Sequence, residues 1–219
     1  MWTILCDFDG TIMKDDVAEL VLERFADPRW RIFNDLLATG KITVEECVSE
    51  EYAMIEASSV EEILDYTNRL NRLRPGFKAF LRDCRAHDIA FTVVSAGIDF
   101  CIRDAFRIKG IETPQLVCPV STLVPKRGLR LVFPRRHSSK SRDFKEDTVM
   151  ALKAQGYKVV YVGDGSGDAN AAERADLVFA VKESMLERIC ERRQIPYRAI
   201  KTFNPVSTFV FRVTPDGRP

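Results

Sequence analysis

Thr3-Ile4-Leu5-Cys6, followed directly by Asp7-Phe8-Asp9-Gly10-Thr11, is the stretch of sequence that decides the fold. A short apolar run that ends in acidic residues is typical of a buried strand that delivers polar groups at its carboxyl end. In an open parallel sheet, ligands bind beyond the carboxyl ends of the strands. The stretch therefore predicts a strand that carries Asp7 and Asp9 to the rim of a functional site.

Downstream of Pro75-Gly76, apolar strands alternate with helical segments. We expect strands at residues 90–94, 159–162 and 177–180, and helices at residues 77–86, 100–107, 144–155, 169–174 and 184–193. Such alternation is typical of an α/β fold with a parallel sheet. The run at 208–213 fits either a helix or a strand, and the tail at 214–219 is rich in turn formers and is expected to fray.

Between residues 16 and 73 the signals are helical instead. Asp27 precedes a proline at a first helical position, and Thr43-x-x-Glu46 and Ser59-x-x-Glu62 read as capping boxes. Gly40 is placed to end one of the short helices. We therefore expect an all-helical cap at 15–74, inserted after the first strand of an α/β core formed by 1–14 and 75–219.

Composition excludes several classes of protein. The chain is 46% hydrophobic and 30% charged with a net charge of +1, and it has no apolar run long enough to span a bilayer and no basic leader. We expect a cytoplasmic protein that binds neither membrane nor nucleic acid. The six cysteines are widely spaced, which favours reduced thiols over a zinc site or a disulfide scaffold. The basic segment from Lys126 to Arg142 is read either as a solvated hairpin or loop or as a surface that gathers an anionic substrate.

Further polar groups follow the expected strands. Ser95-Ala96-Gly97 comes after one strand, Asp164 and Asp168 lie in a glycine-rich loop after another, and Lys145 is near a helix start. Each alone has an ordinary structural explanation, but together they form a set at one sheet edge. The loop does not have the spacing of a dinucleotide fingerprint or of an EF-hand. Acidic residues on such a rim suggest Mg²⁺, which prefers oxygen ligands.

The motifs Asp7-Phe8-Asp9-Gly10-Thr11, Ser95, Lys145 and Gly163-Asp164-x-x-x-Asp168 resemble the four motifs of the haloacid dehalogenase superfamily of phosphatases. The helical insert is similar to the small cap of the group that contains the phosphoserine and methionine-salvage phosphatases. The stretches 24–30 and 94–100 are most similar to the methionine-salvage branch. The resemblance implies a Rossmann-like core and a phosphatase that acts on a small phosphorylated metabolite.

The resemblance also implies roles for individual residues. Asp7 is expected to attack phosphorus and form an aspartyl-phosphate, and Asp9 to act as general acid and then general base. Mg²⁺ would be held by Asp7, the backbone carbonyl of Asp9 and Asp164, with Asp168 in support. The remaining expected site residues are Ser95, Ala96 and Lys145 for phosphate, and Asp16 and Glu51 of the cap for the rest of the substrate.

Three alternatives stay open at this point. The chain resembles a phosphoserine phosphatase as well as a methionine-salvage enzyme, and a phosphotransferase would use the same aspartyl-phosphate. A catalytically idle protein that only binds phosphorylated ligands is the non-enzyme alternative. The sequence does not predict the oligomeric state.

Overall fold

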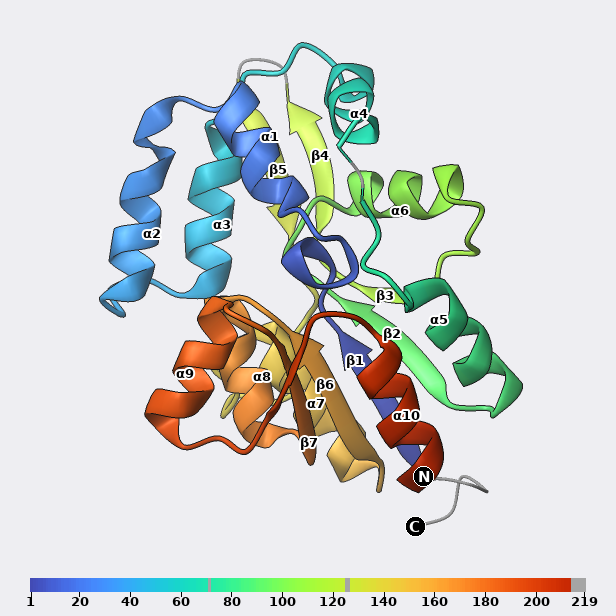
Figure 1. The fold of residues 1–219 in the computed structure, drawn as a ribbon. Helices are drawn as coiled ribbons and strands as arrows, with labels where there is room; N and C mark the ends of the chain where they lie inside the picture. Colours follow the sequence, from blue (N-terminus) through green and yellow to red (C-terminus); the bar gives the residue numbers. More distant parts are fainter. Residues whose placement is uncertain (71, 125–126, 214–219) are drawn as a thin grey trace.

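A six-stranded parallel sheet forms the centre of the computed structural model, which describes residues 1–70, 72–124 and 127–213. The strand order is β3-β2-β1-β6-β7-β8, and each neighbouring pair is parallel. The strands are β1 (Trp2–Cys6), β2 (Ala90–Val94), β3 (Gln115–Val117), β6 (Lys158–Gly163), β7 (Leu177–Val181) and β8 (Arg198–Ile200). The expected α/β fold is confirmed, and β1 lies inside the sheet with its carboxyl end toward the helices of residues 17–68 (Figure 1).

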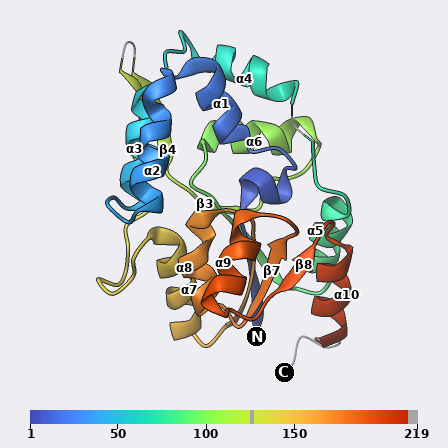
Figure 2. The same ribbon diagram turned by 60° about the vertical axis from the view of Figure 1, so that its left-hand side comes forward.

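Helices cover both faces of this sheet (Figure 2). Residues alternate along β1, so Ile4 and Cys6 join the core on one face while Leu5 joins the core on the other. The first face is covered by α5 (Phe77–Ala86), α6 (Asp99–Ile108) and α10 (Asn204–Val213). The second face is covered by α7 (Phe144–Ala154), α8 (Ala169–Arg174) and α9 (Met185–Arg193). The run at 208–213 is therefore helical, and the residues of the tail at 214–219 lie outside the described ones.

Four short helices follow the turn after β1 and lie above the carboxyl edge of the sheet (Figure 1). They are α1 (Val17–Phe25), α2 (Arg31–Ala38), α3 (Val44–Ala53) and α4 (Val60–Asn68). Thr43 and Glu46 form the expected capping box at the start of α3. At the start of α4 Ser59 accepts a hydrogen bond from the Glu62 backbone, but the Glu62 side chain binds Ser58, so only half of that box is present.

An antiparallel hairpin packs against these helices, and it overlaps the basic segment for which a solvated hairpin or loop was one expectation. Its strands are β4 (Val120–Val124) and β5 (Gly128–Val132). Leu129 is buried in a core shared with Trp30 and Tyr52 of the helical segment. At Gly128 the backbone has a positive φ, and a Cβ there would lie 2.3 Å from the carbonyl oxygen of Ala53. The helical segment thus shares its core with a strand pair from the second half of the chain.

The basic segment belongs partly to this hairpin and partly to the loop before α7. Arg142 pairs with Glu146 and Glu173, and Arg136 donates a hydrogen bond to the Ser141 carbonyl. Lys126 lies outside the described residues. These contacts favour the structural interpretation of the segment over the collection of an anionic substrate.

All six cysteines lie in the described part of the chain, none of them in a disulfide, and five are buried. Within residues 1–70, 72–124 and 127–213, no helix is long and apolar enough to cross a membrane.

Candidate active site

Asp7 lies at the carboxyl end of β1, where the expected site begins. Its backbone N–H donates to the carbonyl oxygen of Val162 on the neighbouring strand β6, at 2.9 Å. Its carboxylate is 6% exposed and accepts a hydrogen bond from the Lys145 ammonium at 2.6 Å. Lys145 is in the first turn of α7, so β1 and α7 together fix this pair.

Burial and the neighbouring charges shift the pKa values of Asp7 and Lys145. Burial and the Asp168 carboxylate raise the pKa of Asp7 to about 7, although Lys145 opposes the shift. Burial alone would lower the pKa of Lys145, but the carboxylates of Asp168 and Asp7 outweigh it and raise that pKa above its usual range. Lys145 is therefore a permanent cation beside a carboxylate in a low-dielectric site.

Asp168 ties the loop after β6 to Lys145. One of its oxygens accepts hydrogen bonds from Lys145 at 2.7 Å and from the Tyr161 hydroxyl at 2.6 Å. The other oxygen accepts from the backbone N–H groups of Asp164 at 3.0 Å and Gly165 at 2.9 Å. Both oxygens of Asp168 are thus engaged in holding Lys145 and the loop in place.

Asp164 projects from the same loop toward the turn after β1. Its carboxylate accepts a hydrogen bond from the Thr11 hydroxyl at 2.7 Å. A Cβ at Gly10 would lie 2.2 Å from the other carboxylate oxygen, so only glycine permits this approach. Burial, followed by the nearby charges of Asp7 and Asp168, raises the pKa of Asp164.

The carboxylates of Asp7, Asp164 and Asp168 each offer one oxygen, and these oxygens all lie within 4.8 Å of one another. Their mutual repulsion is only partly offset by Lys145. An all-oxygen, negatively charged cluster on a sheet rim fits a hard divalent cation. The carboxylate of Asp9 is not in this group.

Asp9 is held between the start of the cap and the loop after β2. One carboxylate oxygen accepts from the backbone N–H of Val17 at 3.1 Å, and the other lies 3.5 Å from the Ser95 hydroxyl. The Ser95 hydroxyl accepts from the Gly97 N–H at 3.0 Å, and a Cβ at Gly97 would lie 2.2 Å from Asp9. Burial, with Asp16 and Asp7 adding to it, raises the pKa of Asp9 well above its usual range, which favours the protonated acid.

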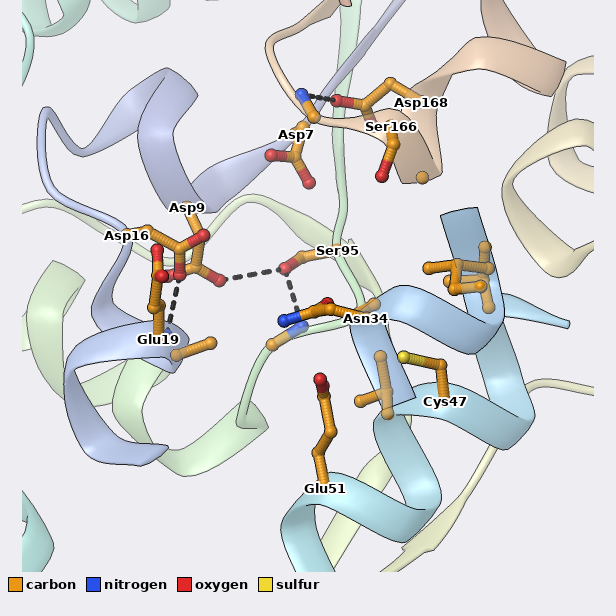
Figure 3. A pocket seen from close by; sticks show the side chains of 18 of the residues that line it. Asp7, Asp9, Asp16, Glu19, Asn34, Cys47, Glu51, Ser95, Ser166 and Asp168 are labelled. Atoms are coloured by element: carbon orange, nitrogen blue, oxygen red, sulfur yellow. Dashed lines mark hydrogen bonds between the residues drawn. The ribbon is translucent and has the colours of Figure 1, made fainter. Parts of the chain in front are cut away.

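One cavity of about 360 Å³ is lined by every site residue expected from the sequence. These are Asp7, Asp9, Asp16, Glu51, Ser95, Ala96, Lys145, Asp164 and Asp168. Figure 3 shows Asp9 and Asp16 side by side, Ser95 joined to Asp9 by a dashed line, and Glu51 pointing into the space from α3. Asp16 also caps α1 through the backbone N–H of Glu19 at 2.8 Å and is exposed, whereas Glu51 is 5% exposed. None of the described residues of the basic segment lines this cavity.

Three further residues support the site and were not expected. Thr11 orients Asp164, Tyr161 binds Asp168, and buried Arg74 donates to the carbonyl oxygens of Thr11, at 2.6 Å, and of Gly10. Thr11 belongs to the first motif and Tyr161 to a strand next to the site, so both carried a signal in the sequence. Arg74 follows the helical segment and carried none.

This fold and this site define a Rossmann-like α/β protein whose site lies at the carboxyl edge of a parallel sheet, with an aspartate directly after the first strand. The family described as haloacid dehalogenase-like hydrolase matches residues 4–173. The chain belongs to this family, as the motifs predicted.

Known proteins support the expected class. A protein of Geobacillus kaustophilus (strain HTA426) named 2-hydroxy-3-keto-5-methylthiopentenyl-1-phosphate phosphatase is 28% identical, with 91% of each chain covered. A protein of the same name from Brevibacillus brevis (strain 47 / JCM 6285 / NBRC 100599) is 27% identical, covering 93% of this chain and 92% of its own. The enzyme class expected from the sequence, a phosphoric monoester hydrolase of the haloacid dehalogenase type, is confirmed.

Solved structures agree on the fold. A phosphoserine phosphatase carrying an analogue of the phospho-aspartyl intermediate has a TM-score of 0.70 at 14% identity, covering 95% of this chain and 98% of its own. A substrate-bound phosphoserine phosphatase complex has a TM-score of 0.69 at 15% identity, covering 95% and 97%. At this identity the likeness concerns the fold.

Proposed function

We propose that this chain is a Mg²⁺-dependent phosphatase that hydrolyses a small phosphomonoester with Asp7 as the nucleophile. One observation carries the proposal: the buried Asp7 carboxylate is held 2.6 Å from the Lys145 ammonium at the floor of the cavity. A carboxylate in that place has a fixed direction of attack and a cation beside it that also suits a phosphoryl oxygen. These are the requirements of an in-line displacement at phosphorus.

The steps follow from the positions of the two aspartates. An Asp7 oxygen forms a bond to phosphorus while the bond from phosphorus to the ester oxygen breaks, and Asp9 gives its proton to that oxygen. The product is an aspartyl-phosphate on Asp7 and a free alcohol. Asp9 then takes a proton from water, whose oxygen attacks phosphorus and releases inorganic phosphate and the Asp7 carboxylate. The raised pKa of Asp9 supports its role as the proton donor.

The phosphoryl group would be held by Ser95, Ala96 and Lys145, which line the cavity from two different strand ends. Lys145 is additionally part of the N-terminal turn of α7, where the helix dipole favours an anion. Because this cation and the helix terminus are already in place, they stabilise the charge of the transition state without reorganisation.

Mg²⁺ would be held by Asp7, the backbone carbonyl of Asp9, and Asp164, with Asp168 positioning the loop that carries Asp164. When bound, the ion offsets the repulsion between the attacking carboxylate and the phosphate dianion. The hydrogen bonds on both oxygens of Asp168 favour this supporting role over direct ligation.

The substrate is proposed to be a small phosphorylated metabolite that is enclosed by the cap, residues 15–74, against the core formed by 1–14 and 75–219. The methionine-salvage reaction is one candidate because the relatives at 27–28% identity carry that name. A phosphoserine phosphatase-like activity and a phosphotransferase remain the alternatives. The six unpaired cysteines support the proposed cytoplasmic location.

The proposal is tested by incubating the purified chain with Mg²⁺ and a panel of phosphomonoesters that includes methionine-salvage intermediates, phosphoserine and p-nitrophenyl phosphate. We expect release of inorganic phosphate without any added acceptor alcohol. Transfer to an added alcohol with little free phosphate would point to the phosphotransferase. No turnover of any member would contradict the proposal.

A further inference from the structure

The cap side of the cavity has a large excess of negative charge. Seven carboxylates and one cation line the cavity, and that cation, Lys145, is hydrogen-bonded to Asp7 and Asp168. Three of these carboxylates come from the helical segment: Asp16 caps the N-terminus of α1, Glu19 lies in the first turn of α1, and Glu51 lies in α3. None of the described residues lining the cavity supplies a cation for these three. A bound Mg²⁺ and a phosphate dianion cancel each other, so the excess remains when substrate is present.

Glu51 is the least usual of these residues. It is 5% exposed, and its Oε1 atom has no hydrogen-bond partner among the described residues. The neighbouring thiol of Cys47, one turn earlier on α3, stabilises the charged form but is a weak donor. Leaving a buried carboxylate oxygen without a partner costs free energy. Figure 3 shows the side chain aimed into the cavity, where a ligand could provide the partner.

Glu51 has no structural role among the described residues. The N-terminus of α3 is capped by Thr43 and Glu46, and Glu51 forms no salt bridge within the described residues. Its neighbours also oppose its charge: burial, followed by Asp16 and Glu19, raises the pKa of Glu51 to about 7. A cation that can donate a hydrogen bond would reduce the free-energy cost of the buried Glu51 charge.

We propose that the cap side of the cavity binds the protonated primary amine of an amino-alcohol phosphomonoester, and that Glu51 determines this specificity. The inference rests on the proposed phosphatase function and narrows its substrate class. A primary ammonium supplies the N–H donor that Oε1 lacks, which a quaternary ammonium does not. Trp30 and Tyr52, which also line the cavity, offer aromatic surface to the carbon atoms beside the amine.

The test compares two substrates that differ only at the end group. O-Phosphoethanolamine ends in an ammonium, and n-propyl phosphate carries a methyl group of similar size in its place. For the wild-type protein with Mg²⁺ we expect kcat/KM to be about 10- to 100-fold higher for phosphoethanolamine, the range of a charge-assisted hydrogen bond. In Glu51→Gln this ratio should fall close to one, because the neutral amide no longer favours the ammonium over the methyl group.

The controls separate the two proposals. Glu50→Gln makes the same chemical change at the adjacent, exposed position on α3 and should keep the wild-type ratio. Turnover of n-propyl phosphate by Glu51→Gln shows that the variant is folded. Equal kcat/KM for the two substrates in the wild type, or a ratio that survives Glu51→Gln, would overturn the amine assignment while leaving the phosphatase intact. Failure to hydrolyse either substrate or p-nitrophenyl phosphate would overturn both.

Discussion

The Glu45 carboxylate of cap helix α3 accepts a hydrogen bond from the backbone N–H of Phe144, the first residue of core helix α7, at 2.9 Å. Lys145 is the next residue. An acceptor at a helix N-terminus satisfies a backbone donor that has no partner inside the helix. The contact therefore joins the cap directly to the helix that positions the proposed phosphate-binding lysine.

Glu45→Ala should lower kcat/KM on p-nitrophenyl phosphate by about 2- to 12-fold, because it removes a hydrogen bond worth about 0.5–1.5 kcal/mol between α3 and the helix that carries Lys145. Glu45→Gln retains an acceptor and should lose less. Steady-state kinetics on both variants measure the effect, with Glu50→Ala on the exposed side of α3 as the control. Wild-type kinetics for Glu45→Ala would show that the contact does not hold the cap in its working position.

Asp7→Asn should abolish turnover while the protein remains folded. The amide has nearly the same shape as the carboxylate, but it is not a nucleophile, and it removes one charge from the carboxylate cluster. Turnover and circular dichroism are measured on the same preparation. Asp15→Asn is the control, because Asp15 pairs with Arg72 and does not line the cavity. Retention of more than a few per cent of activity in a contamination-controlled preparation would exclude Asp7 as the attacking group.

The sheet could be predicted where its strands are long and buried. β1, β2, β6 and β7 read as continuous apolar runs, because both of their faces are covered by helices. The edge strands β3 and β8 have only three residues each and are partly exposed, so their apolar signal is weak. The hairpin was hidden because its strands are half-exposed and run into a basic segment.

The meeting of Asp7, Ser95 and Asp164 in one cavity could also be predicted, since parallel strands bring their carboxyl ends to one edge. The spacing of residues in the sequence does not show which hydrogen bonds fix each side chain in the site. The four hydrogen bonds on Asp168 depend on Tyr161, Lys145 and the loop amides meeting in three dimensions. The convergence of Asp16 and Glu51 on the cavity likewise depends on how the cap packs on the core.

Activity should require Mg²⁺ and be inhibited by Ca²⁺. The cluster of Asp7, Asp164 and Asp168 offers oxygen ligands, which suit both ions. Ca²⁺ accepts a larger coordination shell, so it can engage both oxygens of Asp7 and leave none free to attack. Phosphate release is measured against Mg²⁺ concentration, and then at fixed Mg²⁺ with added Ca²⁺. Full activity in excess EDTA would rule out the metal requirement.

Phosphoserine should be a poor substrate, because it carries the same ammonium as phosphoethanolamine but adds a carboxylate that would enter the acidic side of the cavity near Glu51. At about 4 Å and an effective dielectric near 20, two like charges repel by roughly 4 kcal/mol, equal to about three orders of magnitude in rate. Its kcat/KM should fall well below that of phosphoethanolamine, and Glu51→Arg should raise it. Glu51→Gln should narrow the gap between the two substrates, because it removes both the partner of the ammonium and the repulsion of the carboxylate. If phosphoserine heads the panel, or neither substitution changes its rank, Glu51 does not face the substrate.

The stability of the protein should depend on pH through Glu51, and the direction can be worked out. Burial, followed by Asp16 and Glu19, raises the pKa of Glu51 from 4.5 to about 7 in the folded state. Between these two values the folded protein binds more protons than the unfolded chain, so its stability falls as the pH rises. Below this window Glu51 is protonated in both states, and above it the full penalty of burying the charge remains.

Glu51→Gln cannot ionise and should be free of this penalty. In metal-free buffer its melting temperature should match that of the wild type near pH 4.5 and exceed it increasingly up to about pH 7, after which the difference stays constant. For a chain of this size each kcal/mol corresponds to about 2–4 °C. Paired thermal melts across this range measure the difference, and the exposed Glu50→Gln should show none that varies with pH. If the difference in melting temperature between Glu51→Gln and the wild type does not vary with pH, or grows toward acid pH, Glu51 already has a partner in the folded protein. It would then not need a substrate ammonium as its partner, and the amine proposal would lose its main support.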